Sequence, residues 1–219
     1  MSISVLTGAN RGIGLELAKQ LSEAGHTVVA LVRTSTPELD ALPVEVIDGI
    51  DVTSDDLSAV KTAIGQRSIA LLVNNAGLLR RTSLTDLSLD AVRQQFEVNT
   101  LGPLKITHAL LPNMERGGKI AHVTSRMGSV HDNTSGSHYG YRMSKAALNM
   151  AAKSMAVDLA AREIAVCVLH PGYVRTRMTG NTGYIDTDES ARGLVARIQA
   201  LSMDNSGTFW HQNGEELPW

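Results

Sequence analysis

Short apolar runs alternate with longer helix-like stretches along the chain, and this alternation constrains the fold more than any other feature. Runs rich in Val, Ile and Leu recur at residues 3–6, 27–32, 44–47, 69–73, 119–123 and 165–169, and a weaker one follows at 208–210. Apolar residues in these runs do not alternate with polar ones. That pattern is typical of strands buried on both faces of a parallel sheet.

The stretches between these runs carry apolar residues at the spacing of one helix face. Leu15, Ala18, Leu21 and Ala24 lie three residues apart, and similar patterns follow at 57–64, 89–111, 144–161 and 190–201. The segment 34–43 is too short for a full helix and is interpreted as a loop with one turn. The alternation predicts an α/β fold. We expect one Rossmann-fold domain over residues 1–219, with a doubly wound parallel sheet of about seven strands and helices on both faces.

The composition excludes several classes of protein. Hydrophobic residues make up 43% of the chain and the net charge is −2, which excludes a disordered protein and gives no basic excess for binding nucleic acid. Cys167 is the sole cysteine, so no intrachain disulfide and no Cys-rich zinc site can form, and no other metal-ligand spacing is present. The longest apolar runs span about five residues, whereas a bilayer needs about 20. Without a secretion signal at the N-terminus, we expect a cytoplasmic protein with no membrane or nucleic-acid partner.

The first predicted strand leads into a glycine-rich segment, Thr7–Leu15, and then directly into a helix. Glycines let the backbone turn sharply and approach a pyrophosphate, and a helix N-terminus supplies free N–H groups. The spacing is G-x-x-x-G-x-G rather than G-x-G-x-x-G, and glycines also serve ordinary turns. The position between strand and helix nevertheless favours nucleotide binding. The candidate residues are Gly8, Asn10, Arg11, Gly12, Ile13 and Gly14.

The end of the second predicted strand bears on which nucleotide is bound. An NAD site usually has Asp or Glu about twenty residues after the glycine loop, to bind the ribose 2′-hydroxyl. This chain has Arg33 there, followed by Thr34 and Ser35. A guanidinium can pair with a 2′-phosphate, and Arg11 can add a second positive charge. The sequence therefore favours NADP(H). The alternative is that both arginines are solvated surface residues.

Tyr141 is followed four residues later by Lys145, a spacing that no other tyrosine of the chain has. On a helix these side chains share one face. A nearby ammonium lowers the pKa of a phenol, which can then exchange a proton with an alcohol while a hydride moves at the carbon. Ser125 follows the fifth predicted strand, where the ends of parallel strands line a ligand crevice, and can hold the substrate oxygen. A surface helix pair and a helix cap are the alternatives.

With these residues in place, the chain resembles the short-chain dehydrogenase/reductase family. The matching motifs follow the family order across residues 5–176 and are highly specific together: Thr7-Gly8-x-x-x-Gly12-Ile13-Gly14, Asp51-Val52, Asn74-Asn75-Ala76-Gly77, Asn99, Ser125, Tyr141-x-x-x-Lys145 and Pro171-Gly172. The segments 206–209 and 214–219, with TGANRGIGL at residues 7–15, are similar to the compact subgroup of C-factor-like and sniffer-like carbonyl reductases.

The resemblance implies the catalytic roles. Tyr141 would be the acid/base, and Ser125 would bind the substrate oxygen. Lys145 would bind the nicotinamide ribose and tune Tyr141. Asn99 would kink its helix so that its main chain holds a water in a proton relay beside Lys145. An ordinary polar helix residue is the alternative for Asn99.

The resemblance also implies two halves within the domain. Residues from about 1 to 100 would bind the cofactor, and residues from about 101 to 219 would carry the catalytic groups and bind the substrate. Asp51 would bind the adenine amino group with Val52 near the ring, although Asp51 can equally cap the following helix. Residues 75–77 would lie on the adenine-ribose side and support the central strand, although Asn74 and Asn75 can equally satisfy a turn. Pro171-Gly172 would border the nicotinamide and Thr176 would bind its carboxamide. The cofactor residues beyond the glycine loop are Arg33, Asp51, Val52, Asn75, Ala76, Gly77, Tyr141, Lys145, Pro171, Gly172, Val174 and Thr176.

The loop after Ser125 departs from the family pattern. The stretch before Tyr141 is a few residues longer than usual, so Ser129 and Ser137 are alternative hydroxyl donors. Arg126 stands where a small or apolar residue is expected, and we expect it to point to solvent rather than to an acidic substrate group. The same loop carries two histidines, His131 and His138, which can line a pocket but more often are solvated.

The resemblance favours an NADPH-dependent carbonyl reductase that acts on a small-molecule ketone or aldehyde. It implies a homodimer or homotetramer formed through the Ala- and Met-rich helix at 144–161, with a monomer as the alternative. A second hypothesis is an NADP(H)-binding signalling or sensor protein of C-factor type, in which turnover is not the main role. A dehydrogenase that works in the oxidative direction with NAD is disfavoured by Arg33.

Overall fold

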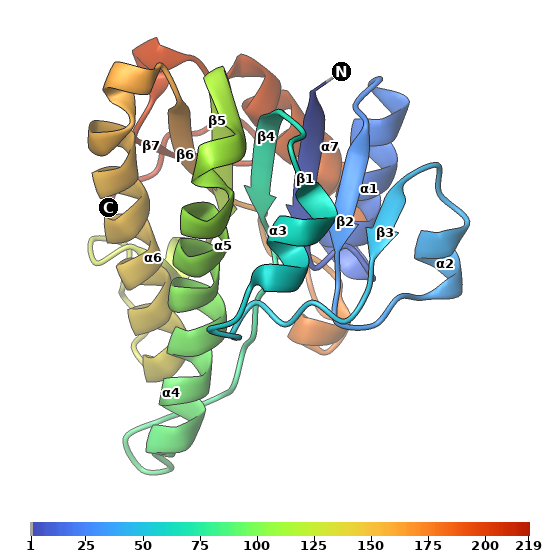
Figure 1. The fold of residues 1–219 in the computed structure, drawn as a ribbon. Coiled ribbons are helices and arrows are strands. Elements are labelled where there is room, and N and C mark those ends of the chain that lie inside the picture. Colours follow the sequence, from blue (N-terminus) through green and yellow to red (C-terminus); the bar gives the residue numbers. More distant parts are fainter. Residues whose placement is uncertain (1) are drawn as a thin grey trace.

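The structure of the protein is a computed structural model that describes residues 2–219. It is built around a single parallel sheet. In this part of the chain seven strands lie in the order β3-β2-β1-β4-β5-β6-β7 (Figure 1). The strands are β1 (Ile3–Thr7), β2 (Val28–Leu31), β3 (Glu45–Ile47), β4 (Ile69–Asn74), β5 (Met114–Val123), β6 (Ala165–His170) and β7 (Thr208–His211). This is the doubly wound α/β sheet that the alternating pattern predicted.

Helices cover both faces of the sheet. α1 (Gly12–Glu23) and α7 (Thr187–Ala200) pack on one face, and α3 (Ser58–Ile64), α5 (Gly102–Leu110) and α6 (Tyr139–Asp158) on the other (Figure 1). α4 (Leu89–Phe96) continues through a π-helical turn, Glu97–Leu101, into α5. The predicted loop at 34–43 contains one helical turn, α2 (Pro37–Asp40), which begins after an N-cap at Thr36.

Two aliphatic cores, one on each side of the sheet, explain why the strand segments are apolar throughout. All five residues of β1 are buried, and they divide between the two cores or pack beside them. Phe209 is the only aromatic among the largest fully buried side chains of the described residues. Aliphatic side chains from α1 and α7 fill one core, and those from α3, α5 and α6 fill the other.

Two elements begin earlier than the sequence pattern indicated. β5 starts at Met114 rather than at 119, because the strand continues through Gly117 and Gly118, which interrupt the apolar signal. α6 starts at Tyr139 rather than at 144, because its first turn carries polar and aromatic residues instead of the Ala-rich pattern. The second difference matters for the site, since it places Tyr141 inside the helix.

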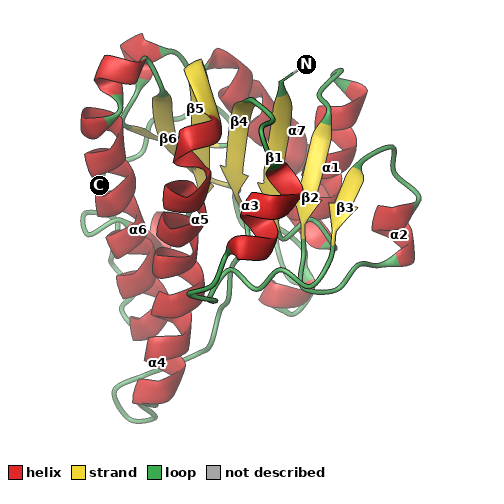
Figure 2. Ribbon diagram, in the orientation of Figure 1, coloured by secondary structure: helices red, strands yellow, loops and turns green. Residues whose placement is uncertain are grey.

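The sheet has a topological switch between β1 and β4. These neighbours pair in parallel, and the strand order runs toward β3 on one side and toward β7 on the other. The carboxyl ends of the strands meet at one edge, where the connecting loops gather (Figure 2). A crevice at such a switch point is where open α/β sheets bind ligands. Within residues 2–219, no helix is both long enough and apolar enough to span a membrane.

Candidate active site

The glycine loop between β1 and α1 is packed so tightly against the end of β4 that two of its glycines are required. Gly8 has a φ of +70°, and a Cβ on it would lie 2.9 Å from Ala76 Cα. A Cβ on Gly14 would overlap the carbonyl oxygen of Gly8 and lie 2.5 Å from Asn75 Nδ2. α1 begins at Gly12 without a side-chain cap from Arg11, so its first N–H groups are available to an anion.

Asn75 and Ala76 fix this loop to β4. The amides of Asn75 and Ala76 donate to Thr7 Oγ1 at 3.0 and 3.1 Å, and Asn75 Nδ2 donates to the carbonyls of Thr7 and Gly8, both at 3.1 Å. The side chain of Asn75 therefore supports the glycine loop. The predicted glycine-loop residues and residues 75–77 lie together at the switch point.

The end of β2 presents positive charge and no carboxylate. Arg33 and Arg11 are both exposed, and neither makes an ion pair among the described residues. Asn10 Nδ2 donates to the Thr34 carbonyl at 2.9 Å, which ties the glycine loop to the segment after β2. Two unpaired guanidinium groups on connected loops are a suitable cradle for a phosphate.

Asp51 and Val52 follow β3 on the same edge. Asp51 Oδ1 accepts from the N–H of Thr53 at 2.9 Å and from its hydroxyl at 2.8 Å. These hydrogen bonds, led by the one from the Thr53 backbone, lower the pKa of Asp51, and the charge of Arg33 acts in the same direction. Asp51 is exposed and closes a turn, whereas Val52 is buried against Gly102. Asp51 does not cap the following helix, which was the alternative, because α3 begins only at Ser58 and has Leu57 as its N-cap. The second oxygen of Asp51 stays available.

Ser125, Tyr141 and Lys145 converge behind β5, and all three are buried. Lys145 Nζ donates to the carbonyl of Val123 at 2.8 Å and lies 5.9 Å from the centroid of the Tyr141 ring. Ser125 follows directly after Thr124 at the end of β5, and its Oγ accepts from the N–H of Met127 at 3.1 Å. Ser125 also lies close enough to Tyr141 to lower the pKa of the phenol, so the structure brings the three residues together.

Burial controls the protonation of this trio. It raises the pKa of Tyr141 to about 12, with the hydrogen bond to Ser125 acting in the opposite direction. Burial also lowers the pKa of Lys145 to about 7. The expectation that the lysine lowers the pKa of the tyrosine is not met here, because loss of solvation is the largest cause of the shift and Lys145 is not among its causes. Tyr141 is a neutral phenol at neutral pH, the form that can donate a proton.

Asn99 lies in the π-helical turn between α4 and α5, and both the oxygen and the nitrogen of its side-chain amide form hydrogen bonds. Its Nδ2 donates to the Leu78 carbonyl at 2.8 Å and to Ser144 Oγ at 3.0 Å, and its Oδ1 accepts from the Leu78 N–H at 2.7 Å. A Cβ on Gly77 would lie 3.5 Å from Asn99 Oδ1 and 3.9 Å from Lys145 Nζ. The distorted helix that was expected at Asn99 is present, and its side chain connects the loop after β4 with α6.

The loop after β4 is joined to the start of α6 by residues that the sequence analysis missed. The buried hydroxyl of Thr82 accepts from the N–H of Gly140 at 3.3 Å, and the Thr82 carbonyl accepts from the N–H of His138 at 2.7 Å. A Cβ on Gly140 would collide with Gln95, whose Oε1 accepts from the N–H of Arg80 at 2.8 Å. Because these partners lie far apart in sequence, no local pattern could have revealed them.

The sequence analysis expected Arg126 to point to solvent, but its guanidinium group is bound by two acidic residues. Its guanidinium contacts both oxygens of Glu215 at 2.9 Å, and Asp132 lies 3.4 Å from its Nε. The acidic residues that fix it come from the following loop and from the segment after β7, which no sequence spacing indicated. Arg126 therefore holds the C-terminal segment against the loop that follows Ser125.

The two alternative serine donors and the loop histidines have other partners. Ser129 Oγ donates to the Trp219 carbonyl at 3.1 Å, and Ser137 Oγ donates to the Thr82 carbonyl at 3.2 Å. The N–H of His131 also donates to Trp219, and His138 precedes α6 in a left-handed conformation with a φ of 52°. Of the three serines, only Ser125 affects the pKa of Tyr141.

The segment after β6 closes the other side of the crevice. Ser190 Oγ donates to the Pro171 carbonyl at 2.7 Å, and a Cβ on Gly172, whose φ is +88°, would meet Ile185 at 2.9 Å. Val174 is buried and forms an isolated bridge with Ile185. Thr176 Cγ2 lies 3.8 Å from the position of a Cβ on Gly12, so this segment reaches the glycine loop.

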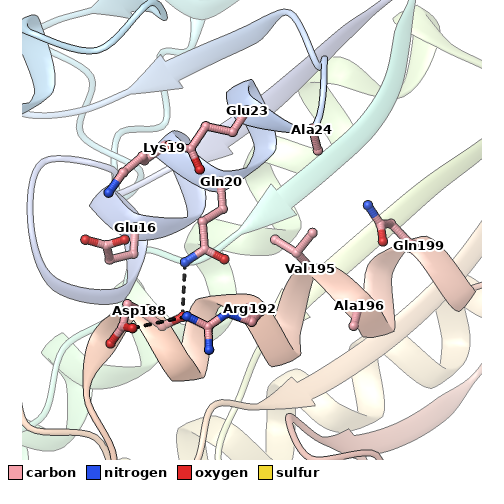
Figure 3. Close-up of a pocket in the computed structure, with 10 residues that line it drawn as sticks. All are labelled: Glu16, Lys19, Gln20, Glu23, Ala24, Asp188, Arg192, Val195, Ala196 and Gln199. Atoms are coloured by element: carbon pink, nitrogen blue, oxygen red, sulfur yellow. Dashed lines mark hydrogen bonds and ion pairs between the residues drawn. The ribbon is translucent and has the colours of Figure 1, made fainter.

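A surface groove between α1 and α7 is separate from this site. It has a volume of about 570 Å³ and contains none of the candidate residues (Figure 3). Gln20 Nε2 donates across it to the Asp188 carbonyl at 3.0 Å, and Arg192 pairs with the Asp188 carboxylate at 3.2 Å. No group of three or more metal-ligating side chains occurs among residues 2–219.

Comparison with known proteins agrees with this arrangement. A model of the family described as short chain dehydrogenase matches residues 2–184. The chain is 37% identical to 1-hydroxy-2-glutathionyl-2-methyl-3-butene dehydrogenase of Rhodococcus sp. (strain AD45), with 100% of both chains covered. It is 41% identical to C-signal of Myxococcus xanthus, with 74% of this chain and 100% of the relative covered. The NADPH-bound carbonyl reductase from chicken fatty liver superposes with a TM-score of 0.87 at 28% identity, with 100% of both chains covered.

Proposed function

Because the chain belongs to the short-chain dehydrogenase family, we propose that it is an NADPH-dependent oxidoreductase that reduces a ketone or aldehyde to an alcohol. The observation that carries the proposal is the buried group of Ser125, Tyr141 and Lys145, with Lys145 Nζ 5.9 Å from the Tyr141 ring centroid, at the edge of the sheet that holds the glycine loop. The similarity to an NADPH-bound carbonyl reductase supports the same assignment.

The crevice fits NADPH. The cofactor would supply a hydride to the carbonyl carbon when bound. The glycine loop, where Gly8 and Gly14 leave no space for a Cβ, and the uncapped start of α1 can hold the diphosphate. Arg33 and Arg11 can hold the 2′-phosphate, since both are exposed and neither forms an ion pair among the described residues. Asp51 and Val52 on the adenine side, residues 75–77 in the middle, and Pro171, Gly172, Val174 and Thr176 on the nicotinamide side complete the proposed cofactor contacts.

The proton would come from Tyr141. Ser125 would donate a hydrogen bond to the carbonyl oxygen, which stabilises the negative charge that develops there. The pKa of Tyr141, about 12, keeps the phenol protonated until an alkoxide forms beside it. As an ammonium, Lys145 would stabilise the resulting phenolate and bind the nicotinamide ribose. Asn99 would position Lys145 and Tyr141 indirectly, by fixing Leu78 and Ser144, and its main chain would hold the water of the relay.

The first test is a fluorescence titration with NADPH and NADH, followed by turnover of a panel of activated aldehydes and ketones. Tight binding of NADPH with turnover is the expected result. Tyr141→Phe should lower kcat by at least about a hundredfold while leaving the Kd for NADPH within about twofold. Tyr139→Phe, two residues earlier on α6, is the matched control and should keep its activity. Absence of nucleotide binding would refute the assignment.

The similarity to C-signal supports one second candidate, an NADP(H)-binding signalling protein in which turnover is not the main role. The two candidates differ in what Tyr141→Phe does. A signalling activity that depends only on bound nucleotide would survive the substitution, whereas reduction would not. Binding of NADPH without turnover of any carbonyl would favour this second candidate.

The reaction can also run in the oxidative direction through the same residues. The Rhodococcus relative is named as a dehydrogenase, so both directions need to be assayed. Arg33→Asp should weaken NADPH binding at least about tenfold and favour NADH, because a carboxylate repels the 2′-phosphate. An unchanged preference would restore the NAD-dependent alternative.

We also propose a homodimer or homotetramer that forms through α6. Met143, Met150 and Val157 lie seven residues apart on this helix with 49%, 69% and 68% of their surface exposed. Leu104, on the neighbouring α5, is 43% exposed as well. A second subunit would cover this apolar stripe. A cytoplasmic location remains a prediction from the sequence.

A further inference from the structure

The guanidinium groups of most arginines among the described residues have a partner within the protein, but those of Arg80 and Arg81 do not. Carboxylates pair with six arginines (Arg67, Arg93, Arg116, Arg126, Arg175 and Arg192), and backbone carbonyls bind Arg142 and Arg162. No such partner within residues 2–219 reaches Arg80 or Arg81, and both are exposed. Neither residue was singled out by a sequence motif.

The other uncompensated arginines have different surroundings. Arg11 and Arg33 lie on the proposed cofactor side. Arg177 follows Thr176, which reaches the glycine loop, so it also belongs to that side. Arg197 is on α7, where it packs under Gly214. Arg80 and Arg81 are thus the two arginines without a partner among the described residues on the segment that is hydrogen-bonded to the start of α6.

The backbone of Arg80 and Arg81 is held in place next to the start of α6. The N–H of Arg80 donates to the buried Gln95 Oε1 at 2.8 Å, and Leu78, two residues earlier, is clamped by Asn99. Thr82, one residue later, accepts from Gly140, the residue before Tyr141. Both arginines therefore belong to a segment whose backbone is fixed by hydrogen bonds. Tyr141 directly follows Gly140, the residue that binds this segment.

The charges around this segment leave it positive. Asp86 is the only acid between residues 75 and 88, and it forms no ion pair with either arginine. Across the loop that follows Ser125, the carboxylate of Asp132 already faces Arg126. Two adjacent like charges repel each other, and an anion relieves that repulsion. A guanidinium matches a carboxylate in shape and can bind it through two parallel hydrogen bonds.

We propose that Arg80 and Arg81 form a carboxylate-binding subsite, so that the preferred substrates are aldehydes or ketones that carry a carboxylate away from the reacting carbonyl. This inference rests on the proposed reductase function and specifies its substrate class. Both side chains are exposed, so each pair with a carboxylate contributes roughly a factor of two to five. Together the two arginines should give about a tenfold preference, which salt weakens by screening.

The test compares 4-formylbenzoate with its methyl ester, which presents the same aldehyde without the charge. With NADPH, we expect kcat/KM of the wild-type protein to be about tenfold higher for the acid. The variant Arg80→Gln/Arg81→Gln should lose most of this preference through a higher KM for the acid, with the rate on the ester and the Kd for NADPH unchanged. Arg116→Gln removes one charge at the opposite edge of the sheet, where Arg116 pairs with Glu163, and should keep the preference.

Two results would overturn the inference: a wild-type protein that reduces the ester as well as the acid, or a double variant that keeps the preference. If neither aldehyde is reduced, the reductase assignment is what fails. In that event, displacement of a fluorescent carboxylate from the NADPH complex by 4-formylbenzoate and by the ester decides on the subsite. Tighter binding of the acid that is lost in Arg80→Gln/Arg81→Gln supports it, and equal binding of acid and ester overturns it.

Discussion

His122 should make the protein sensitive to mild acid. It lies on β5, fully buried, with its Nδ1 3.3 Å from Asn74 Nδ2, and its Nε2 has no partner among the described residues. Burial, with a smaller effect from the charge of Lys145, lowers the pKa of His122 from 6.5 to about 3. A cationic imidazole at this position would be unsolvated and close to an ammonium, so the folded protein keeps His122 neutral.

The magnitude follows from the two pKa values. Between pH 6.5 and about 3 the unfolded chain binds a proton at this residue and the folded protein does not, so the free energy of unfolding falls as the pH is lowered. Each pH unit costs about 1.4 kcal/mol. From pH 6.5 to pH 5 the loss is therefore about 2 kcal/mol, a large part of the ~5–15 kcal/mol that stabilises a typical domain.

Urea unfolding at a series of pH values between 7 and 5, on wild-type protein and on His122→Asn, measures this loss. Asparagine keeps a polar side chain beside Asn74 but cannot take up a proton in this range. The variant should be less stable at pH 7, yet its stability should fall about 2 kcal/mol less on going to pH 5. His108→Asn, at an exposed position on α5, controls for the replacement itself. If the unfolding free energies of wild type and His122→Asn fall equally between pH 7 and pH 5, the reasoning is refuted.

Three further predictions concern the site and its surface. Gly14→Ala should weaken NADPH binding at least about tenfold and cost about 1–3 kcal/mol of unfolding free energy, because the added Cβ overlaps Gly8; unchanged titration and urea curves would contradict this. The kcat/KM for reduction should fall as the pH rises through about 7, where Lys145 loses its proton, and a pH profile that is flat from 6 to 9 would argue against an ammonium at that step. Met150→Glu should shift the oligomer toward monomer in light scattering after gel filtration, and an unchanged mass would place the interface elsewhere.

The sheet could be predicted from the sequence because its central strands are buried on both sides. In a chain of this composition, an unbroken apolar run such as the one at 69–73 is rarely anything but a buried strand. The start of α6 could not be predicted in the same way. Gly140, in its first turn, donates to Thr82 and packs against Gln95, and no local helix signal marks this turn. Tertiary contacts therefore decide where the helix begins.

The reactive residues were found because their chemistry depends on local spacing. Tyr141 and Lys145 lie one helical turn apart, and the glycines of the loop follow one another closely. The partners of Arg126 could not be found, since Glu215 is 89 residues away and carries no signal of its own. The protonation states were equally hidden, because the depth of burial that raises the pKa of Tyr141 is a property of the folded protein.

Because of the π-helical turn at Glu97–Leu101, this part of the protein should tolerate a substitution better than the deletion of a residue. Such a turn contains one residue more than an α-helical turn would need. Losing Thr100 or Leu101 would remove this extra residue and rotate α4 and Asn99 relative to α5 by about 100°. Asn99 would then leave Leu78, and Gln95 would leave Arg80. Gene variants or designed libraries that shorten this segment by one codon should therefore lose the site even where each substitution in it is tolerated.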